Sequence, residues 1–343
     1  MTPVHLLVPE GVDDPRRPSG GNVYDRRLAD ALVLAGWTVR EQAVRERGGG
    51  SLAAALASLP DESVVLADGI VTRGRSAVVA EHARRLHLVV LLHEPVGPDR
   101  DEGLVLESAA AVVATSRWTA DRVAGAYGLD PRRLHVARPG VDTWPAHAGT
   151  DGGGRLLCVG AITEGKGQRE LVETLGTLTD LAWECRIVGS PQVEPSYARE
   201  VARRTHDLGL DGRVTWTGPL VGDVLAGAYA AADLLVVPSR AETYGMVITE
   251  ALAQGVPVVA SAVGGVAEAL GHTPTGAEPG MLVDAADPQA LGRALRRWLT
   301  DPGLRTRLRQ HARERRATLT GWGTTAAVVA GVLGALRREA VAT

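Results

Sequence analysis

Apolar runs of strand length alternate with longer stretches of helical period along the whole chain. Runs with little polar interruption are typical of strands that are covered on both faces, as in a parallel sheet. In the first half they predict strands at 4–8, 38–42, 63–67, 88–92, 111–115 and 134–137. A helix should open near Gly21, run to about Leu34 and stop at Gly36. The alternation therefore predicts βα repeats around a parallel sheet.

A second half repeats this pattern after a linker. The stretch from Trp144 to Gly154 is small, polar and glycine-rich, which is typical of an interdomain segment. Strands are then predicted at 155–159, 184–188, 213–217, 234–237, 256–261 and 280–283. Helices are expected at about 168–178, 194–208, 220–230, 245–254, 288–299, 302–315 and 321–338. We therefore predict an α/β chain of two Rossmann-like, doubly wound parallel-sheet domains, with a ligand in a central cleft beyond the carboxyl ends of both sheets.

Length and composition agree with this architecture. A chain of 343 residues is too long for one ordinary core. Apolar residues make up 45% but aromatic ones only 3%, so the core must consist of Val, Leu and Ala. The cysteines Cys158 and Cys185 lie in apolar strand-like runs, which indicates reduced core thiols rather than a disulfide or metal site.

Charge and targeting signals narrow the function classes. A net charge of −3 gives no overall basic character of the kind that attracts nucleic acid. The first residues lack the basic and apolar regions of a signal peptide. No apolar run reaches the roughly 18 residues that a membrane-spanning helix needs. We therefore predict a cytoplasmic protein. The arginines between Arg305 and Arg316 could contact an anionic membrane surface, but their polar neighbours favour a solvated helix face.

Lys166 is the one lysine among 37 basic residues, and it lies between Gly165 and Gly167. Arginine is larger and hydrogen-bonds as a planar fork, so a position that keeps the compact ammonium has a reason to need it. Flanking glycines let the backbone approach a ligand closely. This indicates a phosphate or another small anion in a tight loop; the alternative is a surface turn that holds lysine by chance.

The segment from Val237 to Glu268 is the densest in candidate chemistry. It runs V-P-S-R-A-E-T-Y-G-M-V-I-T-E-A-L-A-Q-G-V-P-V-V-A-S-A-V-G-G-V-A-E. A buried strand ends at Val237, and a helix starts near Gly245, where unpaired amides bind anions well. Glu242 and Glu250 lie on either side of this helix start and could bind a polyhydroxylated ligand. The alternatives are a capping carboxylate for Glu242 and a solvated helix face for Glu250.

This segment resembles the signature of the retaining, nucleotide-sugar-dependent glycosyltransferases of the GT-B fold, the large family 4 group. Their hallmark is two glutamates separated by seven residues in a P-S-x-x-E-x-[FY]-G-x-x-x-x-E-A frame, and this sequence has every fixed element of it. Weaker matches follow in the family's order: Ser19-Gly20-Gly21-Asn22, His93-Glu94, Pro139-Gly140-Val141-Asp142, Gly160 through Gly167, and Trp322.

The resemblance implies a GT-B organisation. Residues 1–147 would form the acceptor-side domain, residues 148–320 the donor-binding domain, and residues 321–343 a helix that packs back toward the first domain. The enzyme would move a sugar from a UDP- or GDP-sugar to a hydroxyl of a small-molecule, glycan or lipid acceptor. Neither a metal nor a cofactor is expected. We expect no nucleic-acid partner, at most peripheral membrane contact, and a monomer or homodimer.

The resemblance also implies roles for individual residues. The catalytic residues would be His93, Lys166 and Glu242. Lys166 would neutralise the donor diphosphate, with Glu242 on the sugar hydroxyls and Glu250 on the ribose. The remaining donor-binding residues would be Gly20, Gly21, Tyr244, Gly245, Met246 and Val247. Asn22, Tyr24 and His93 would face the acceptor; the alternatives are helix packing for Asn22 and Tyr24, and a core position for His93.

Some residues depart from the family pattern, and other enzyme classes stay open. Ala161 stands where an arginine normally provides a second cation, so either Arg240 or Arg138 reaches the diphosphate, or Lys166 bears more of its charge. Another GT-B enzyme, such as an epimerase or a phosphorylase, would share the nucleotide or phosphate site. A nicotinamide-dependent dehydrogenase is disfavoured because no G-x-G-x-x-G with a distal acid follows a strand.

Overall fold

The computed structural model describes residues 3–45, 49–147 and 149–342, which fall into two compact units. Unit 1 comprises Met1–Asp13, Gly20–Gly140 and Thr320–Thr343, and unit 2 comprises Asp14–Ser19 and Val141–Leu319. The chain therefore passes from unit 1 to unit 2 between residues 140 and 141 and returns between 319 and 320. The sequence predicts these two boundaries at 147/148 and 320/321. Each unit is described by itself.

Unit 1 contains a six-stranded parallel sheet with the order β2-β1-β3-β4-β5-β6. Its strands are β1 (Val4–Pro9), β2 (Val39–Val44), β3 (Val64–Asp68), β4 (His87–Leu92), β5 (Ala111–Ala114) and β6 (Leu134–Val136). Its helices are α1 (Gly20–Leu34), α2 (Gly49–Ala57), α3 (Gly69–Thr72), α4 (Ser76–His82), α5 (Arg100–Ser108), α6 (Arg117–Tyr127), the 3-10 turn η1 (Pro131–Arg133) and α14 (Trp322–Ala342).

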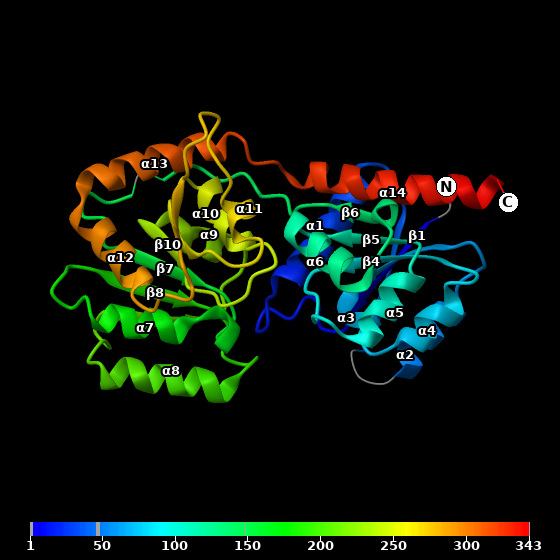
Figure 1. The fold of residues 1–343 in the computed structure, drawn as a ribbon, viewed down its shortest axis with the longest axis horizontal. Coiled ribbons are helices and arrows are strands. Elements are labelled where there is room, and N and C mark those ends of the chain that lie inside the picture. Colours follow the sequence, from blue (N-terminus) through cyan, green and yellow to red (C-terminus); the bar gives the residue numbers. More distant parts are fainter. Residues whose placement is uncertain (1–2, 46–48, 148, 343) are drawn as a thin grey trace. The chain divides into compact units, whose positions relative to one another are not determined.

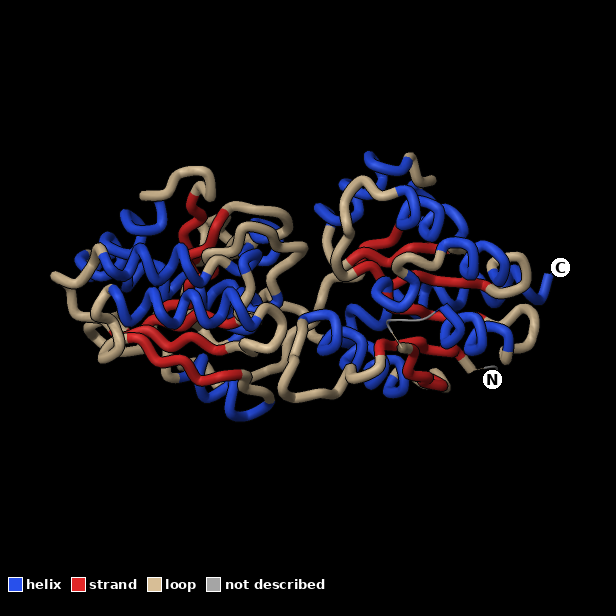
Figure 2. The backbone as a smooth tube through the Cα atoms, turned by 90° about the horizontal axis from the view of Figure 1, so that it is seen from below, coloured by secondary structure: helices blue, strands red, loops and turns tan. Residues whose placement is uncertain are grey.

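Alternate strand residues of unit 1 face two separate cores. Leu6, Leu66 and Leu91 point to one face, which α1 and α14 cover. Leu7 and Val65 point to the other, which α2, α4, α5 and α6 cover. Figure 2 shows the strands of the sheet between these helices. Because both faces are covered, the inner strands β3 and β4 are nearly unbroken apolar runs, whereas the edge strand β2 is half polar and mostly exposed.

Unit 2 repeats the architecture with the strand order β12-β11-β10-β7-β8-β9. Its strands are β7 (Arg155–Val159), β8 (Glu184–Val188), β9 (Val214–Gly218), β10 (Leu234–Val237), β11 (Val258–Ser261) and β12 (Gly280–Val283). Its helices are the 3-10 turn η2 (Glu164–Lys166), α7 (Gln168–Gly176), α8 (Pro195–Asp207), α9 (Gly222–Ala230), α10 (Met246–Ala253), α11 (Val266–Leu270), α12 (Ala290–Thr300) and α13 (Pro302–Arg316). Helices α7, α8, α12 and α13 cover one face, and α9, α10 and α11 cover the other.

All twelve predicted strands and the predicted doubly wound fold are confirmed, with shifts at the ends. Two residues of the strand predicted at 256–261 lie outside β11. The amide of Val256 donates to the carbonyl of Ala251 at the end of α10. Pro257 has no amide hydrogen that could be donated to a neighbouring strand. Cys158 and Cys185 are free and buried on the adjacent strands β7 and β8, as predicted for core thiols.

The arginines of α13 bind the protein itself. Arg305 is buried and donates to the carbonyl of Trp298. Arg309 binds the carbonyl of Thr150, and Arg316 binds the carbonyls of Ala253 and Trp144. The expectation of a solvated helix face is therefore wrong for these three side chains, because they satisfy carbonyls at the ends of neighbouring segments.

Candidate functional site

The predicted donor residues of unit 2 gather at the point where its strand order reverses. Strand β7 pairs with β8 on one side and with β10 on the other, so the chain switches direction across the sheet between β7 and β10. Ligands of such sheets bind outside the carboxyl ends of the strands at this point. The loop 160–167 follows β7 and the loop 238–245 follows β10, so both predicted motifs lie there.

Lys166 and Glu242 form an ion pair across these two loops. The Lys166 ammonium lies 2.7 Å from Oε2 of Glu242, and Ser239 donates to the same oxygen over 3.3 Å. The Glu242 side chain is only 10% exposed and that of Lys166 is 35% exposed. Glu242 is thus a largely buried partner of the lysine rather than a helix cap, and Lys166, in the turn η2, is held by this ion pair.

Glycines allow these loops to touch backbone to backbone. Gly167 has φ +70°, and a Cβ there would lie 2.0 Å from the carbonyl oxygen of Pro238. Gly264, with φ +55°, lies equally close to Glu242, since its Cβ would be 1.8 Å from that carbonyl oxygen. The amide of Arg240 also donates to the carbonyl of Gly165 over 2.9 Å. These contacts fix the loop that carries Glu242 from both sides.

Helix α10 begins beside this pair. Gly245 precedes it with φ +94° and has no side chain to cap the amides of Met246 and Val247. Glu250 lies farther along the helix, where Oε2 accepts a 2.6 Å hydrogen bond from the hydroxyl of Tyr229 on α9. Burial and the nearby Glu250 charge keep the pKa of Tyr229 well above its usual value, so the phenol stays a donor. The expected alternative of a solvated position for Glu250 is wrong.

Tyr244 is buried at 6% exposure in the core under α10. Its ring therefore supports the start of the helix from below.

Of the two arginines suggested to replace the missing cation at Ala161, Arg240 is engaged elsewhere. Its guanidinium binds Glu170 through Nε over 3.0 Å and Glu164 through a terminal nitrogen over 2.6 Å. Arg138 is exposed and belongs to unit 1. Arg240 and Lys166 thus lie in the two loops at this switch point, and Lys166 is the one of the two that pairs with Glu242.

Unit 1 places its predicted residues at the switch point of its own sheet, which lies between β1 and β3. His93 follows β4 directly, and its ring packs under Gly21, where an added Cβ would lie 3.2 Å from the ring carbon Cδ2. Its Nε2 lies 2.8 Å from Oδ1 of Asp25, which is fully buried. Burial opposes a charge on the ring, but the charge and hydrogen bond of Asp25 raise the pKa of His93 to about 9.

Tyr24 does not face open space. It is 1% exposed, its hydroxyl donates to the carbonyl of Ala137 over 2.9 Å, and its ring packs edge-on against His93 and Trp322. The structure thus favours the packing alternative that the sequence left open for this residue. Asn22, two positions earlier on α1, is half-buried.

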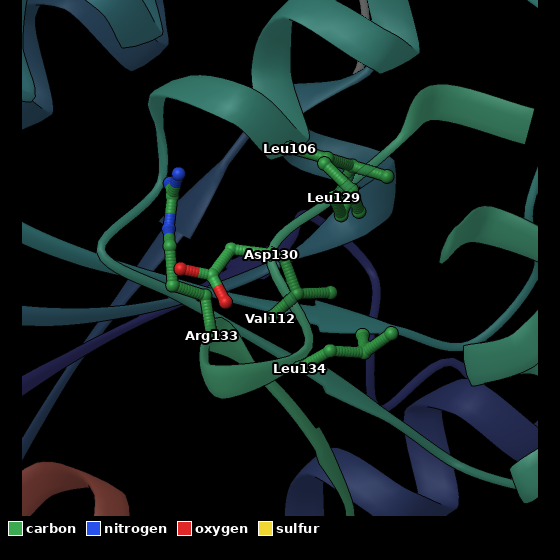
Figure 3. A pocket seen from close by; sticks show the side chains of 6 residues that line it. All are labelled: Leu106, Val112, Leu129, Asp130, Arg133 and Leu134. Atoms are coloured by element: carbon green, nitrogen blue, oxygen red, sulfur yellow. The ribbon is translucent and has the colours of Figure 1, made fainter. Parts of the chain in front are cut away.

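Two hollows in unit 1 lie away from all of these residues. The first admits no water-sized sphere and is lined by Leu106, Val112, Leu129, Asp130, Arg133 and Leu134, as Figure 3 shows. The Arg133 guanidinium binds the carbonyls of Glu107 and Ala109. The second, of about 590 Å³, runs along β6 and α14. Neither contains a predicted site residue.

The C-terminal half matches a known family model. Residues 144–315 match the model described as "Glycosyl transferases group 1". A D-inositol 3-phosphate glycosyltransferase of Xylanimonas cellulosilytica is 34% identical over 258 residues, which cover 70% of this chain and 60% of the relative. The chain belongs to the glycosyl transferases group 1 family. A D-inositol 3-phosphate glycosyltransferase 1 of Catenulispora acidiphila is 32% identical over 74% of this chain and 65% of that relative. This group 1 chain thus spans less than two thirds of the length of both relatives.

Solved structures show the GT-B fold for this group 1 protein. Sucrose-phosphate synthase from Thermosynechococcus elongatus matches with a TM-score of 0.81 and 22% identity, over 99% of this chain and all of that one. Anabaena HepE in complex with UDP-glucose matches with a TM-score of 0.77 and 20% identity, over 98% of this chain and all of that one. Across the described residues, no helix of the group 1 chain has the length and apolar character that a membrane span requires.

Three residues around the predicted sites were missed from the sequence: Tyr229, Asp25 and Asp68. Asp68 gave a usable signal, because a carboxylate ends an otherwise apolar strand at the carboxyl edge of a parallel sheet. Asp25 and Tyr229 lie inside helices and gave none. Their roles in the group 1 chain depend on partners that are distant in sequence.

Proposed function

We propose that this group 1 protein is a retaining glycosyltransferase that moves a sugar from a UDP- or GDP-sugar to a hydroxyl acceptor. The observation that carries this proposal is the Lys166–Glu242 pair at the switch point of unit 2. Beside it lie the uncapped start of α10 and, along that helix, Glu250. One cation, a row of amides and two carboxylates match the phosphates, the sugar and the ribose of a nucleotide sugar.

The chemistry follows from where charge develops. Breaking the sugar–phosphate bond leaves negative charge on the diphosphate, and preorganised donors lower that barrier. Lys166 would meet the diphosphate together with the amides of Met246 and Val247. In the free protein its ammonium donates to Glu242 over 2.7 Å, so the two side chains already lie side by side. Glu242 would then accept hydrogen bonds from sugar hydroxyls, and Glu250 from the ribose.

Unit 1 would supply the remaining contacts. Gly20 and Gly21 would offer backbone to the donor phosphates, and His93 and Asn22 would lie beside the reacting sugar and the acceptor. In the family, such transfer proceeds on one face of the sugar, with the leaving phosphate taking the proton of the acceptor. We propose the same course here, without a metal ion or cofactor.

Ligand binding tests the donor class first. A ligand at about 100 times its Kd stabilises a protein by about 2.7 kcal/mol, so thermal shifts with UDP, GDP, ADP and their sugars rank the nucleotides directly. We expect a shift with UDP or GDP and a larger one with the matching sugar nucleotide. The absence of any shift with all three nucleotides would refute the donor site.

Turnover assays then distinguish a glycosyltransferase from an epimerase. Nucleotide release is measured with and without candidate acceptors, including a phosphorylated cyclitol because the relatives are named for one. We expect release to depend on the acceptor, to persist in EDTA, and to give a product whose anomeric signal matches the donor's. Stoichiometric release of free nucleotide without any acceptor would favour an epimerase instead.

Tyr229→Phe should weaken donor binding while leaving the chemical step intact. The variant removes the hydroxyl that donates to Glu250, so the carboxylate loses a partner that orients it toward the ribose. We expect the donor KM to rise about tenfold, equivalent to about 1.4 kcal/mol, with kcat little changed. The control is Tyr197→Phe, which removes a hydroxyl bound to the Arg169 amide on α7. Equal KM values for Tyr229→Phe and wild type would exclude this orienting role.

A further inference from the structure

Three titratable side chains meet beneath the start of α1 in unit 1. Asp25 comes from α1, Asp68 ends β3, and His93 follows β4. One ligating atom of each lies within 4.8 Å of the others. Both carboxylates are fully buried, and the His93 side chain is 10% exposed. The charged groups that act on the ring come from α1 and β3, and the Tyr24 ring packs against it edge-on.

The hydrogen bonds of this cluster leave two carboxylate oxygens and the ring nitrogen Nδ1 of His93 buried without a partner among the described residues, so that a charged ring would keep one N–H for a ligand. Asp25 uses Oδ1 for the ring of His93, and Asp68 uses Oδ1 for the amide of Ile70 over 2.7 Å. Their Oδ2 atoms are both buried and have no partner among the described residues. Two ionised carboxylates with unsatisfied oxygens at one buried place are unfavourable, and such pairs hold a proton between them.

The environment indicates which carboxylate is neutral. Burial raises the pKa of Asp68 well above its usual range; the His93 charge lowers it, and the neighbouring Asp25 raises it further. Asp25 instead contacts the ring directly. A proton on Asp68 Oδ2, donated to Asp25 Oδ2, would satisfy both unpartnered oxygens and leave Asp25 ionised against the ring. This arrangement is neutral overall: one imidazolium, one carboxylate and one carboxylic acid.

We propose that Asp25 is a positioning residue that keeps the His93 ring charged and fixed, and that Asp68 supports it by sharing a proton with Asp25. This inference rests on the proposed function of His93. The ring lies against Gly21, and the first turn of α1 carries no acidic side chain. The cluster as a whole then adds no net negative charge beneath the positive end of this helix, where a phosphate group of the donor would be favoured.

Histidine NMR tests the charge without reference to activity. The full chain is labelled with ¹⁵N-histidine, and the His93 ring is assigned as the signal lost in His93→Gln. In wild type we expect the imidazolium signature to persist above pH 8. In Asp25→Asn the amide oxygen can still accept from Nε2, but the charge is gone, so the ring should become neutral near its ordinary pKa of about 6.5 or below. A neutral His93 in wild type at pH 7 would overturn the proposal.

The two carboxylates should respond differently to the same chemical change. In Asp68→Asn the new side-chain amide would accept from the Ile70 amide and donate to Asp25, as a protonated aspartate does. This variant should therefore leave both the fold and the His93 charge unchanged. Asp30→Asn, an exposed position on α1, is the control for an amide on this helix. If Asp25→Asn fails to fold, the Asp68→Asn variant still decides, because loss of the imidazolium there would contradict the shared proton.

Activity against pH completes the test. Wild type should keep its kcat/KM up to about pH 8, whereas Asp25→Asn should lose about 30-fold at pH 8 and recover toward pH 6, following a histidine pKa near 6.5. A pH-independent loss in Asp25→Asn would refute the inference while leaving the transferase proposal intact. No transfer by any variant, with the expected NMR titrations, would refute the transferase and support the charge assignment.

A bound cation is the competing explanation for the three ligating atoms. Stoichiometric Zn²⁺ or Mn²⁺ added to EDTA-treated protein should leave the His93 signals in place. A shift or loss of those signals, abolished in Asp68→Asn, would establish a metal site and overturn the shared proton.

Discussion

Replacing Lys166 by alanine is expected to lower kcat by about 10²–10³-fold, the loss that follows removal of one preorganised donor to a developing oxyanion. The variant removes the cation that would face the leaving diphosphate. It also leaves Glu242, only 10% exposed, without the ammonium that neutralises it. The measurement is the steady-state rate at saturating donor and acceptor, with the melting temperature recorded so that misfolding is not mistaken for lost catalysis.

A matched control and a conservative variant sharpen this result. Arg169→Ala removes a nearby exposed cation on α7 that pairs with Glu200, and it should leave the rate unchanged. Lys166→Arg keeps the charge but replaces the compact ammonium by a planar fork, and we expect it to recover only part of the activity. A rate for Lys166→Ala within about threefold of wild type would show that Lys166 does not stabilise the transition state.

The surroundings of Lys166, rather than the rarity of lysine in this chain, favour a main role for it at the diphosphate. The position that normally holds a second phosphate-binding arginine is Ala161. Arg240, which could have replaced it, is bound to Glu164 and Glu170. Releasing that guanidinium would require breaking both ion pairs. We therefore propose that the Lys166 ammonium and the backbone amides at the start of α10 are the main donors of the anion site of unit 2.

The architecture could be predicted because both faces of each sheet are buried. Leu66 and Val65 face different cores, yet both positions must be apolar, so β3 from Val64 to Ala67 is an unbroken apolar run in the sequence. The ends were less certain, since they depend on single hydrogen bonds such as that of the Val256 amide. Asp68 shows the same limit: the predicted strand stops at Ala67, whereas β3 continues to the carboxylate.

The partners of the site residues could not be predicted, because long-range packing selects them. The ion pair of Lys166 joins residues 76 positions apart, and that of His93 joins residues 68 positions apart. Local pattern placed Tyr24 on a helix beside the glycine loop, which fits either an acceptor contact or a core position. Only the tertiary hydrogen bond from the Tyr24 hydroxyl to the carbonyl of Ala137 shows that this side chain lies in the core.

Gly264→Ala is expected to damage both stability and donor binding. A Cβ at this position would lie 1.8 Å from the carbonyl oxygen of Glu242, and φ is +55°, where side chains are disfavoured. The conformational cost is about 1–2 kcal/mol, and overpacking adds about 1–3 kcal/mol more. Because the contact is with backbone, the loop must move, and the Glu242 carboxylate moves away from Lys166 with it. We expect the thermal shift with the donor nucleotide sugar to be lost.

Gly222→Ala provides the control for the conformational term alone. Gly222 has φ +57° and nothing within 4 Å of an added Cβ, so it shares the backbone strain but not the clash. The melting temperature of Gly264→Ala should therefore fall below that of Gly222→Ala by about 2–12 °C, since 1 kcal/mol corresponds to about 2–4 °C for a domain of this size. Equal melting temperatures and an intact nucleotide-sugar shift would show that the loop carrying Glu242 tolerates displacement. Its packing against Gly264 would then not be what positions the carboxylate.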